Sequence, residues 1–177
     1  MNTANRTARK IKSELSSREL IMSATLRLIA QEGIDAVTHR RVAEIAGVSP
    51  GTTTHHFAGR EGLLRESFIS HLSSGDTLFA RFYAIAAQDG RLAIDSVREA
   101  LVQLVEREFA DPSLLRAEYE LMLFASQDDE LGQAVTAWEA RAAGAIAAVM
   151  EQAGARRPAE AARTLTNFIR GFELERL

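Results

Sequence analysis

The spacing of apolar residues along the chain predicts helices throughout. Five apolar residues in the first such segment recur at intervals of three and four, so they share one helix face. They are Leu20, Ile21, Ala24, Leu28 and Ile29, in a helix expected over residues 17–32. Ser16 and Glu19 have the spacing of a capping box at its start, and Gly33 supplies its end. Because no strand-length run alternates apolar and polar residues between hairpin turns, we expect an all-α fold.

Further helices are predicted by the same pattern and by proline. All three prolines fit the first position of a helix, where the missing N–H is not needed. Ser49 before Pro50 and Asp111 before Pro112 are favourable N-caps. The expected helices lie between Thr38 and Gly47, from Ser49 to near Phe57, from Arg60 to a kink or end at Gly75, and at about 91–110, 112–126, 130–153 and 158–177. The last has no Gly, Asn or Pro stop before Leu177, so the chain either ends within a helix or has been truncated.

Composition limits the class of protein. With 46% hydrophobic and 25% charged residues, the 177-residue chain is typical of a folded protein. The absence of cysteine excludes disulfides, a thiol nucleophile and a cysteine-ligated zinc site, and it fits a reducing cytoplasm, the expected location. No uninterrupted apolar run reaches the length of a membrane-spanning helix. The basic start of the chain lacks the apolar core of a secretory signal and is expected to be a flexible arm over residues 1–15.

Charge is divided unevenly along the chain. Residues 1–70 hold ten Arg and Lys against seven Asp and Glu, a balance of +3, whereas residues 71–177 hold eleven against seventeen, a balance of −6. The two parts sum to the net charge of −3. A basic first part suggests a segment that meets phosphates, joined to one that does not.

A short helix, a tight turn and a second short helix form the arrangement that fits the major groove of DNA. Here the elements are residues 38–46, the dipeptide Gly47-Val48 and residues 49–56. Glycine allows the positive φ that ends a helix before a turn, and Ser49 caps the second helix. That helix opens with the small residues Pro50, Gly51, Thr52, Thr53 and Thr54, which permit a close approach to base edges. The alternative is a capped surface helix without function.

The whole run from Thr38 to Leu64, THRRVAEIAGVSPGTTTHHFAGREGLL, resembles the signature of the tetracycline-repressor (TetR/AcrR) family. The resemblance covers about residues 17–68, whereas the remainder is similar only in its helix layout. It implies an N-terminal three-helix DNA-binding domain and a C-terminal helical bundle that binds a ligand and dimerises. We therefore expect a DNA-binding domain over residues 16–62 and a ligand-binding and dimerisation domain over residues 63–177.

The resemblance also assigns roles to single residues. Arg40 lies where a residue of the second helix often contacts DNA, and Arg60 takes the place of the usual phosphate-binding lysine. His56 matches the histidine of the family's His-Phe pair. Thr53-Thr54 replaces the usual Leu-Tyr, so the aromatic contact to the DNA backbone is missing and His55 is its substitute. The DNA-binding candidates are Thr38, His39, Arg40, Ser49, Pro50, Gly51, Thr52, Thr54, His55, His56 and Arg60.

In the family, the middle helices surround an effector pocket. The candidates to line it here are Phe82, Glu118, Tyr119, Met122, Ser126 and Trp138, and the alternative for each is an ordinary place in the core. A buried Glu118 would favour a cationic or hydroxylated ligand. The four histidines have no metal-ligand spacing, so neither a metal nor a cofactor is expected.

Small residues on the helix expected at 130–153 form a ridge that permits close helix packing. They are Ala140, Ala143, Gly144, Ala147 and Ala148, and the apolar residues Ile146, Val149, Met150, Leu165, Phe168, Ile169 and Phe172 add to this surface. We interpret it as a dimer interface, because two recognition helices must meet half-sites about one DNA turn apart. The alternative is that the ridge packs within one subunit.

The resulting hypothesis is a homodimeric repressor, released by a small molecule from a pseudo-palindromic operator. No nucleophile–base pair, phosphate loop or H-E-x-x-H motif points to an enzyme. The competing hypothesis is an all-helical protein-interaction or ligand-binding module that does not bind DNA.

Overall fold

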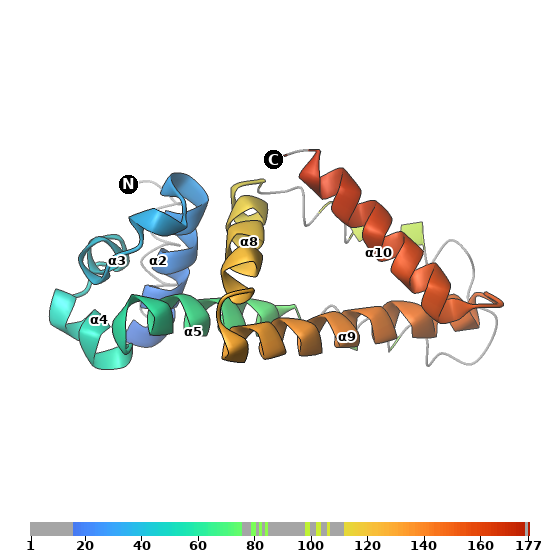
Figure 1. The fold of residues 1–177 in the computed structure, drawn as a ribbon, viewed down its shortest axis with the longest axis horizontal. Helices are drawn as coiled ribbons and strands as arrows, with labels where there is room; N and C mark the ends of the chain where they lie inside the picture. The colour runs from blue at the N-terminus through green and yellow to red at the C-terminus, as the bar shows by residue number, and fades with distance from the viewer. Residues whose placement is uncertain are drawn as a thin grey trace, which may run out of the picture. The chain divides into compact units, whose positions relative to one another are not determined.

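The computed structural model describes residues 16–75, 112–175 and 177, together with residues 79, 80, 82, 84, 98, 99, 102, 103 and 106. All regular secondary structure in these ranges is helical, which confirms the expected all-α fold (Figure 1). The arm expected at residues 1–15 lies outside the described residues, as do Asp111 and most of the helix expected at 91–110.

The chain divides into two compact units, residues 1–70 and 71–177. The division falls within α5 (Gly59–Ser74), which is continuous through it. The domain boundary expected between residues 62 and 63 also falls inside this helix and stays a prediction. Helix α5 ends directly before Gly75, as expected.

The first unit begins with α2 (Ser17–Glu32), whose bounds are those expected from the sequence. Its capping box is formed: the Glu19 carboxylate accepts from the Ser16 backbone N–H at 2.7 Å, and the Ser16 hydroxyl accepts from the Glu19 N–H at 3.3 Å. The hydrogen bonds from Ser16 lower the pKa of Glu19. Gly33, with a φ of 87°, ends the helix in a conformation that other residues rarely adopt.

After α2 come a short 3₁₀ helix, η1 (Ile34–Ala36), and the helices α3 (His39–Ala46) and α4 (Pro50–His56). The sequence pattern did not predict η1, because three residues are too few to show a period. Helices α2, α3 and α4 pack against one another. The first unit buries large side chains with little or no exposed surface, among them Ile21, Leu28, Ile29, Val37, Val42, Phe57, Leu63, Leu64 and Phe68.

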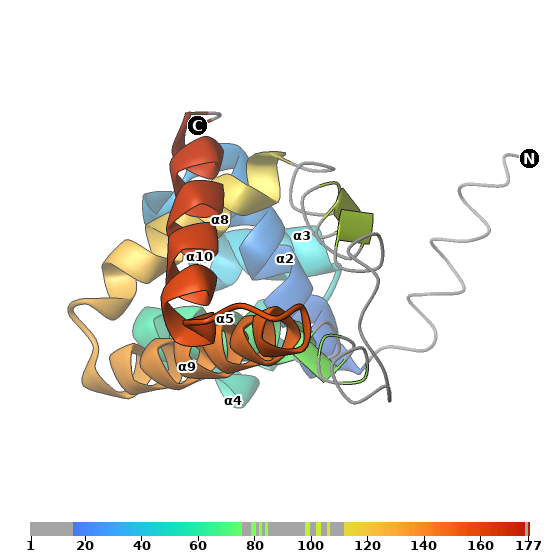
Figure 2. The same ribbon diagram turned by 90° about the vertical axis from the view of Figure 1, so that its right-hand side faces the viewer.

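In the second unit, α8 (Pro112–Ala125), α9 (Asp129–Gln152) and α10 (Pro158–Leu174) follow one another like the sides of a triangle (Figure 1). Figure 2 shows the turn that joins α9 to α10. The Asp128 carboxylate caps α9 by accepting from the Leu131 N–H at 2.9 Å. Gly154, with a φ of 84°, allows the sharp turn before α10. Within the described ranges, no helix combines the length and apolarity of a membrane-spanning segment.

Packing within this unit centres on α9. Phe79 and Phe82 contact Ala145 and Val149 in a buried cluster, with Trp138 packed against it. The expected small-residue ridge on α9 is not fully covered: Ala140 and Ala143 are exposed, and Gly144, Ala147 and Ala148 are half-buried. On α10, Phe168 is 72% exposed and Phe172 is 41% exposed. An apolar surface therefore remains open on these two helices.

Candidate functional site

Helices α3 and α4 are joined by a turn that Gly47 makes possible. Gly47 has a φ of 67° in the left-handed region, and its N–H donates to the Glu44 carbonyl at 3.2 Å. The next N–H, that of Val48, donates to the Ala43 carbonyl at 3.0 Å. These bonds satisfy carbonyls left open at the end of α3. The helix–turn–helix expected at residues 38–56 is therefore present.

The start of α4 is fixed by its cap. The Ser49 hydroxyl accepts from the Thr52 N–H at 3.2 Å and lies 2.8 Å from the Thr52 hydroxyl oxygen. Pro50 occupies the first turn, where it breaks no helical hydrogen bond. An added Cβ at Gly51 would meet only the Ser49 hydroxyl oxygen, at 3.8 Å. Gly51 is therefore not required by packing within this chain, which leaves its surface available to a partner.

Thr53 and Thr54 have different surroundings, although they are neighbours. Thr53 is fully buried, and its hydroxyl donates to the Pro50 carbonyl at 2.7 Å and lies 3.4 Å from the His39 carbonyl. It thus packs the first turn of α4 against the first turn of α3. The exposed Thr54 hydroxyl donates to the Gly51 carbonyl at 3.1 Å. Only Thr54 is placed to contact a partner outside the chain.

The contact through Thr53 brings the candidate DNA-binding residues of α3 and α4 together. Thr38, Arg40, Ser49, Pro50, Gly51, Thr54 and His55 are exposed, and His39, Thr52, His56 and Arg60 are half-buried. Within the described part of the chain, no ion pair neutralises Arg40. Its charge is therefore available to a phosphate.

Arg60 is held differently from Arg40. Its guanidinium donates to the Val37 carbonyl at 3.2 Å and to the Ile34 carbonyl at 2.7 Å, and it lies 3.6 Å from the Asp35 carboxylate. These contacts fix η1, the segment between α2 and α3. The family resemblance predicted that Arg60 contacts a phosphate. In this structure, guanidinium N–H groups of Arg60 donate to backbone carbonyls of the same chain.

The two histidines of α4 pack against each other. The rings of His55 and His56 lie 5.3 Å apart edge to face, which is a packing contact. The buried Nδ1 of His39 has no hydrogen-bond partner in the described chain. No group of three metal-ligating side chains occurs among the residues that the structure describes.

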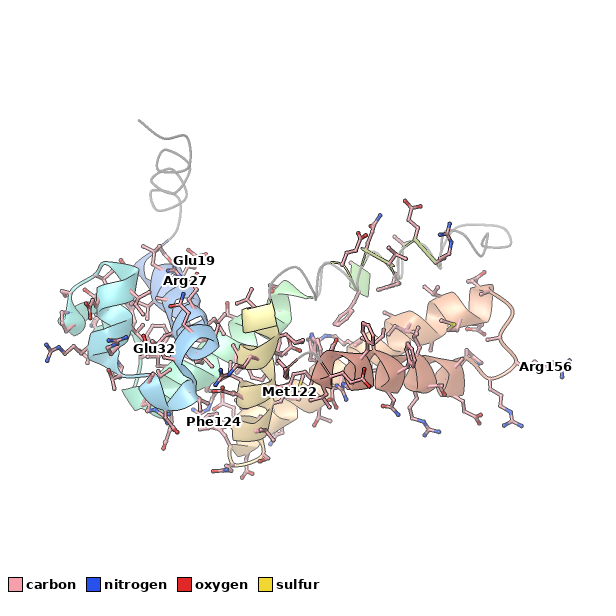
Figure 3. All side chains as sticks on the ribbon, turned by 90° about the horizontal axis from the view of Figure 1, so that it is seen from above. Glu19, Arg27, Glu32, Met122, Phe124 and Arg156 are labelled. Carbon is pink, nitrogen blue, oxygen red and sulfur yellow. The ribbon has the colours of Figure 1, made fainter. Side chains whose placement is uncertain are left out.

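A second site lies in the other unit, as a cavity of about 660 Å³. Its walls are the end of α5, residues Phe79 and Phe82, and the three helices α8, α9 and α10. Met122 and Phe124 point to opposite sides of α8, and Met122 lies on the side toward α9 and α10 (Figure 3). This volume is within the range of sites for drug-sized molecules.

Polar groups from α8 and α10 meet at the wall of the cavity. The Tyr119 hydroxyl donates to the Glu173 carboxylate at 2.8 Å and lies 3.4 Å from the Arg170 carbonyl. Burial raises the pKa of Glu173, and the nearby carboxylate of Glu118 adds to the effect. Burial and the bond to Glu173 also raise the pKa of Tyr119, which stays a neutral hydroxyl.

Two further polar pairs line the same cavity. The Nε2 of His71 lies 3.3 Å from the Glu118 carboxylate, which links the end of α5 to α8. Arg170 on α10 donates to the Glu139 carboxylate on α9 at 2.6 Å. The polar groups that join the helices around the cavity are therefore themselves part of its lining.

Trp138 packs against the end of α5. A Cβ built on Gly75 would lie 3.3 Å from the indole Nε1 and 3.2 Å from the Leu72 carbonyl oxygen, so no larger residue fits without movement. The indole N–H is buried and has no hydrogen-bond partner in the described chain. The Phe79 ring lies 5.7 Å from the Trp138 ring and completes an aromatic wall.

Comparison with known proteins matches both units. Residues 21–67 match the family of bacterial regulatory proteins named tetR, and residues 93–177 match the tetracyclin repressor-like C-terminal domain. The chain belongs to the tetR family. The first match contains α3, α4 and the turn between them, and the second contains α8, α9 and α10.

Among TetR-family relatives, the chain is similar to the HTH-type transcriptional regulator BetI 2 of Chromohalobacter salexigens. The two are 32% identical over 91 residues, which are 51% of this chain and 44% of the relative. The BetI regulator of Pseudomonas paraeruginosa is 34% identical over 94 residues, which are 53% and 45% of the two chains. This chain thus matches less than half of the length of these curated relatives.

Solved structures of the TetR-family fold match more of the chain. A transcriptional regulator of Streptomyces coelicolor A3(2), SCO7518, is 34% identical with a TM-score of 0.64, and the match covers 89% of this chain and 85% of that one. The multidrug binding protein EbrR, complexed with ethidium, is 25% identical with a TM-score of 0.64 over 92% of this chain and 87% of that one.

The cavity of this TetR-family chain can be compared with the residues expected for it. Phe82, Glu118, Tyr119, Met122 and Trp138 line it. Ser126 does not, because it lies beyond the end of α8, where its exposed hydroxyl donates to the Leu123 carbonyl at 2.7 Å. Sequence reasoning missed the charged residues His71, Glu139, Arg163, Arg170 and Glu173. The sequence shows that these residues are charged, but it does not show which helix faces pack together around the cavity.

Proposed function

We propose that this TetR-family chain is a ligand-responsive transcriptional repressor of the cytoplasm and not an enzyme. As a homodimer, it binds a pseudo-palindromic operator through the first turns of α3 and α4. The observation that carries the proposal is the open surface around Gly51 and Arg40, which the chain's own packing does not use. Relatives named as transcriptional regulators support the proposal, and the tetR family match over residues 21–67 includes this surface.

The homodimer is supported by the apolar surface of α9 and α10. Phe168 on α10 is 72% exposed, and the alanine ridge on α9 is partly open. A second copy of the same surface would cover it and would set two recognition helices at a fixed separation. The interpretation that the ridge is used within one subunit is disfavoured, because Ala140 remains exposed in the single chain and does not line the cavity.

Release of the operator is proposed to begin in the cavity. His71, Leu72 and Ser74, in the last turn of α5, line it, and the same helix begins at Gly59 in the first unit. A ligand that favours one position of this turn biases the orientation of the helix. For release, the ligand must bind better to a conformation whose half-site spacing no longer matches the DNA.

Selection from a random-sequence duplex library with the full chain tests the proposal. The expected product is an inverted repeat with half-site centres about one helical turn apart. Phe168→Glu should yield a monomer that loses most operator affinity, whereas Leu123→Glu, at a residue that is 71% exposed on α8, should stay dimeric. Failure to enrich any sequence would support the alternative module without DNA binding.

A further inference from the structure

The charges that line the cavity do not balance. Glu118, Glu139 and Glu173 are the acidic groups, and Arg163 and Arg170 are the arginines. Arg170 donates to Glu139 at 2.6 Å, so these two charges compensate each other. Arg163 is exposed. Two carboxylates, those of Glu118 and Glu173, remain without a full positive charge bonded to them.

The hydrogen-bond partners of these two carboxylates are weak counter-charges. Glu173 accepts from the neutral hydroxyl of Tyr119, and Glu118 lies 3.3 Å from an imidazole nitrogen of His71. Neither partner is an arginine or a lysine. The side chain of Glu118 is only 18% exposed, so water does little to replace a cation there. The cavity is thus preorganised for positive charge.

The rest of the lining is apolar and partly aromatic. Phe79 and Trp138 form a wall with ring centroids 5.7 Å apart, and Phe82, Met122 and Ile146 extend the apolar lining. Such walls bury the body of a ligand, and aromatic faces also attract cations. A small inorganic cation would leave this surface uncovered.

We propose that the cavity binds an organic cation with an apolar body, whose positive centre lies beside Glu118 and Glu173 and whose body lies against Trp138. The proposal rests on the proposed function, because it names the ligand class of the same regulatory site. An organic anion would meet two carboxylates, and of the two arginines in the lining Arg170 is already paired with Glu139 and Arg163 is exposed. A neutral ligand would leave both acidic groups uncompensated in a partly buried place.

Calorimetric titration of the full chain with two dyes tests this ligand class. Ethidium is an aromatic cation, and 8-anilinonaphthalene-1-sulfonate is an aromatic anion that also favours apolar cavities. Trp138 is the single tryptophan of the sequence, so a change in its fluorescence reports binding at this cavity. Ethidium should bind at least about tenfold more tightly than the anion and should alter the tryptophan emission.

Charge-removing variants locate the positive centre. Glu118→Gln and Glu173→Gln should each weaken ethidium binding about tenfold and leave the anion bound equally well or better. Glu120→Gln is the matched control, because Glu120 is on the same helix but pairs with Arg116 outside the lining. Its effect should stay within about twofold. Helical circular dichroism checks that each variant is folded, and Glu173→Gln keeps an acceptor for Tyr119.

Tighter binding of the anion than of ethidium would overturn the proposal, as would the absence of ethidium binding or a folded Glu118→Gln chain with unchanged ethidium affinity. Operator binding by the ligand-free chain is measured in parallel. If the chain binds the operator but does not bind ethidium, only the proposed ligand class is wrong. If the chain binds no duplex at all, the proposed function itself fails, whichever dye the cavity takes.

Discussion

Tyr119 and Glu173, which are 54 residues apart in the sequence, join α8 to α10 through a hydrogen bond of 2.8 Å. The bond closes the triangle of helices at the corner where no turn connects them. It also places a neutral donor on a carboxylate whose pKa is raised by burial. This single contact therefore affects both the stability of the second unit and the charge of its cavity.

Tyr119→Phe should weaken the second unit without opening a large void. The lost hydrogen bond is expected to lower the free energy of unfolding by about 1 kcal/mol. Because the Tyr119 hydroxyl lowers the pKa of Glu173, its removal should raise that pKa further. Chemical denaturation measures the first effect, and a carbon-13 NMR titration of the Glu173 carboxyl measures the second. An unchanged carboxyl titration would show that the bond is not formed in solution.

The raised pKa of Glu173 predicts a pH dependence of stability with a definite sign. Between its ordinary value of 4.5 and the higher value in the folded chain, the folded state binds more protons than the unfolded state. The stability that this group contributes is therefore greatest below pH 4.5 and is lost as pH rises through the folded pKa. Tyr119, Glu118 and Arg170 are the groups that act on this carboxyl.

Glu173→Gln removes this titration and tests its sign. The difference in unfolding free energy between the variant and the unchanged chain should grow in favour of the variant as pH rises from 4.5. Above the folded pKa it should become constant. Denaturation curves at a series of pH values measure the difference, with Glu120→Gln as the control on α8. A difference that moves in the opposite direction would mean that Glu173 is stabilised as an anion.

Local sequence signals were sufficient for the helices but not for the contacts between them. The Ser16 and Glu19 capping box, Gly33 and Gly47 are read within a few residues, so they predicted helix ends that the structure confirms. The partners of Arg60, by contrast, lie 23 and 26 residues upstream. No local pattern connects them, so the sequence did not predict these carbonyl contacts, and the phosphate contact expected of Arg60 stays a prediction.

The same limit applies to the cavity. Tyr119 and Trp138 were expected there because the resemblance to the TetR family implies an effector pocket among the middle helices. The facing charges of α10, Arg170 and Glu173, could not be placed without the angle at which that helix crosses α8 and α9. Ser126 was wrongly grouped with Tyr119 and Met122 by helical spacing, because α8 ends one residue before it.

Gly75→Ala should disturb the contact between α5 and α9. The added methyl would meet the Leu72 carbonyl oxygen at 3.2 Å and the Trp138 Nε1 at 3.3 Å. We expect a loss of about 1 kcal/mol in unfolding free energy and a shift in tryptophan emission. Gly171→Ala is the control, since its Cβ meets nothing within 4 Å in α10 and should gain up to about 1 kcal/mol. Unchanged emission from Gly75→Ala would show that Trp138 is not held by this contact.

Gly51→Ala should weaken operator binding without lowering the stability of the fold. Its Cβ has open space within the chain, and alanine favours helix by about 0.5–1 kcal/mol, so stability should be kept or improved. The methyl would, however, stand on the surface proposed to meet the duplex, and operator affinity should fall at least about tenfold. Gly62→Ala on α5 is the matched control, because its Cβ meets only the Ala58 methyl at 3.8 Å. Equal operator affinity for both variants would remove α4 from the interface.

Arg40 and Arg60 should respond to alanine in different ways, because only Arg60 serves the fold. Arg60→Ala leaves the Ile34 and Val37 carbonyls without their donor and should lower the unfolding free energy by about 1–2 kcal/mol. Arg40→Ala should change stability by no more than about 0.5 kcal/mol. It should nevertheless weaken binding to all operator sequences and reduce the slope of log affinity against log salt by about 1. Denaturation and operator titrations at several salt concentrations separate the two roles. Arg60→Ala could instead reduce the salt slope without lowering the unfolding free energy. That result would mean that the Arg60 guanidinium of the unchanged chain leaves the carbonyls of η1 and binds phosphate in the complex.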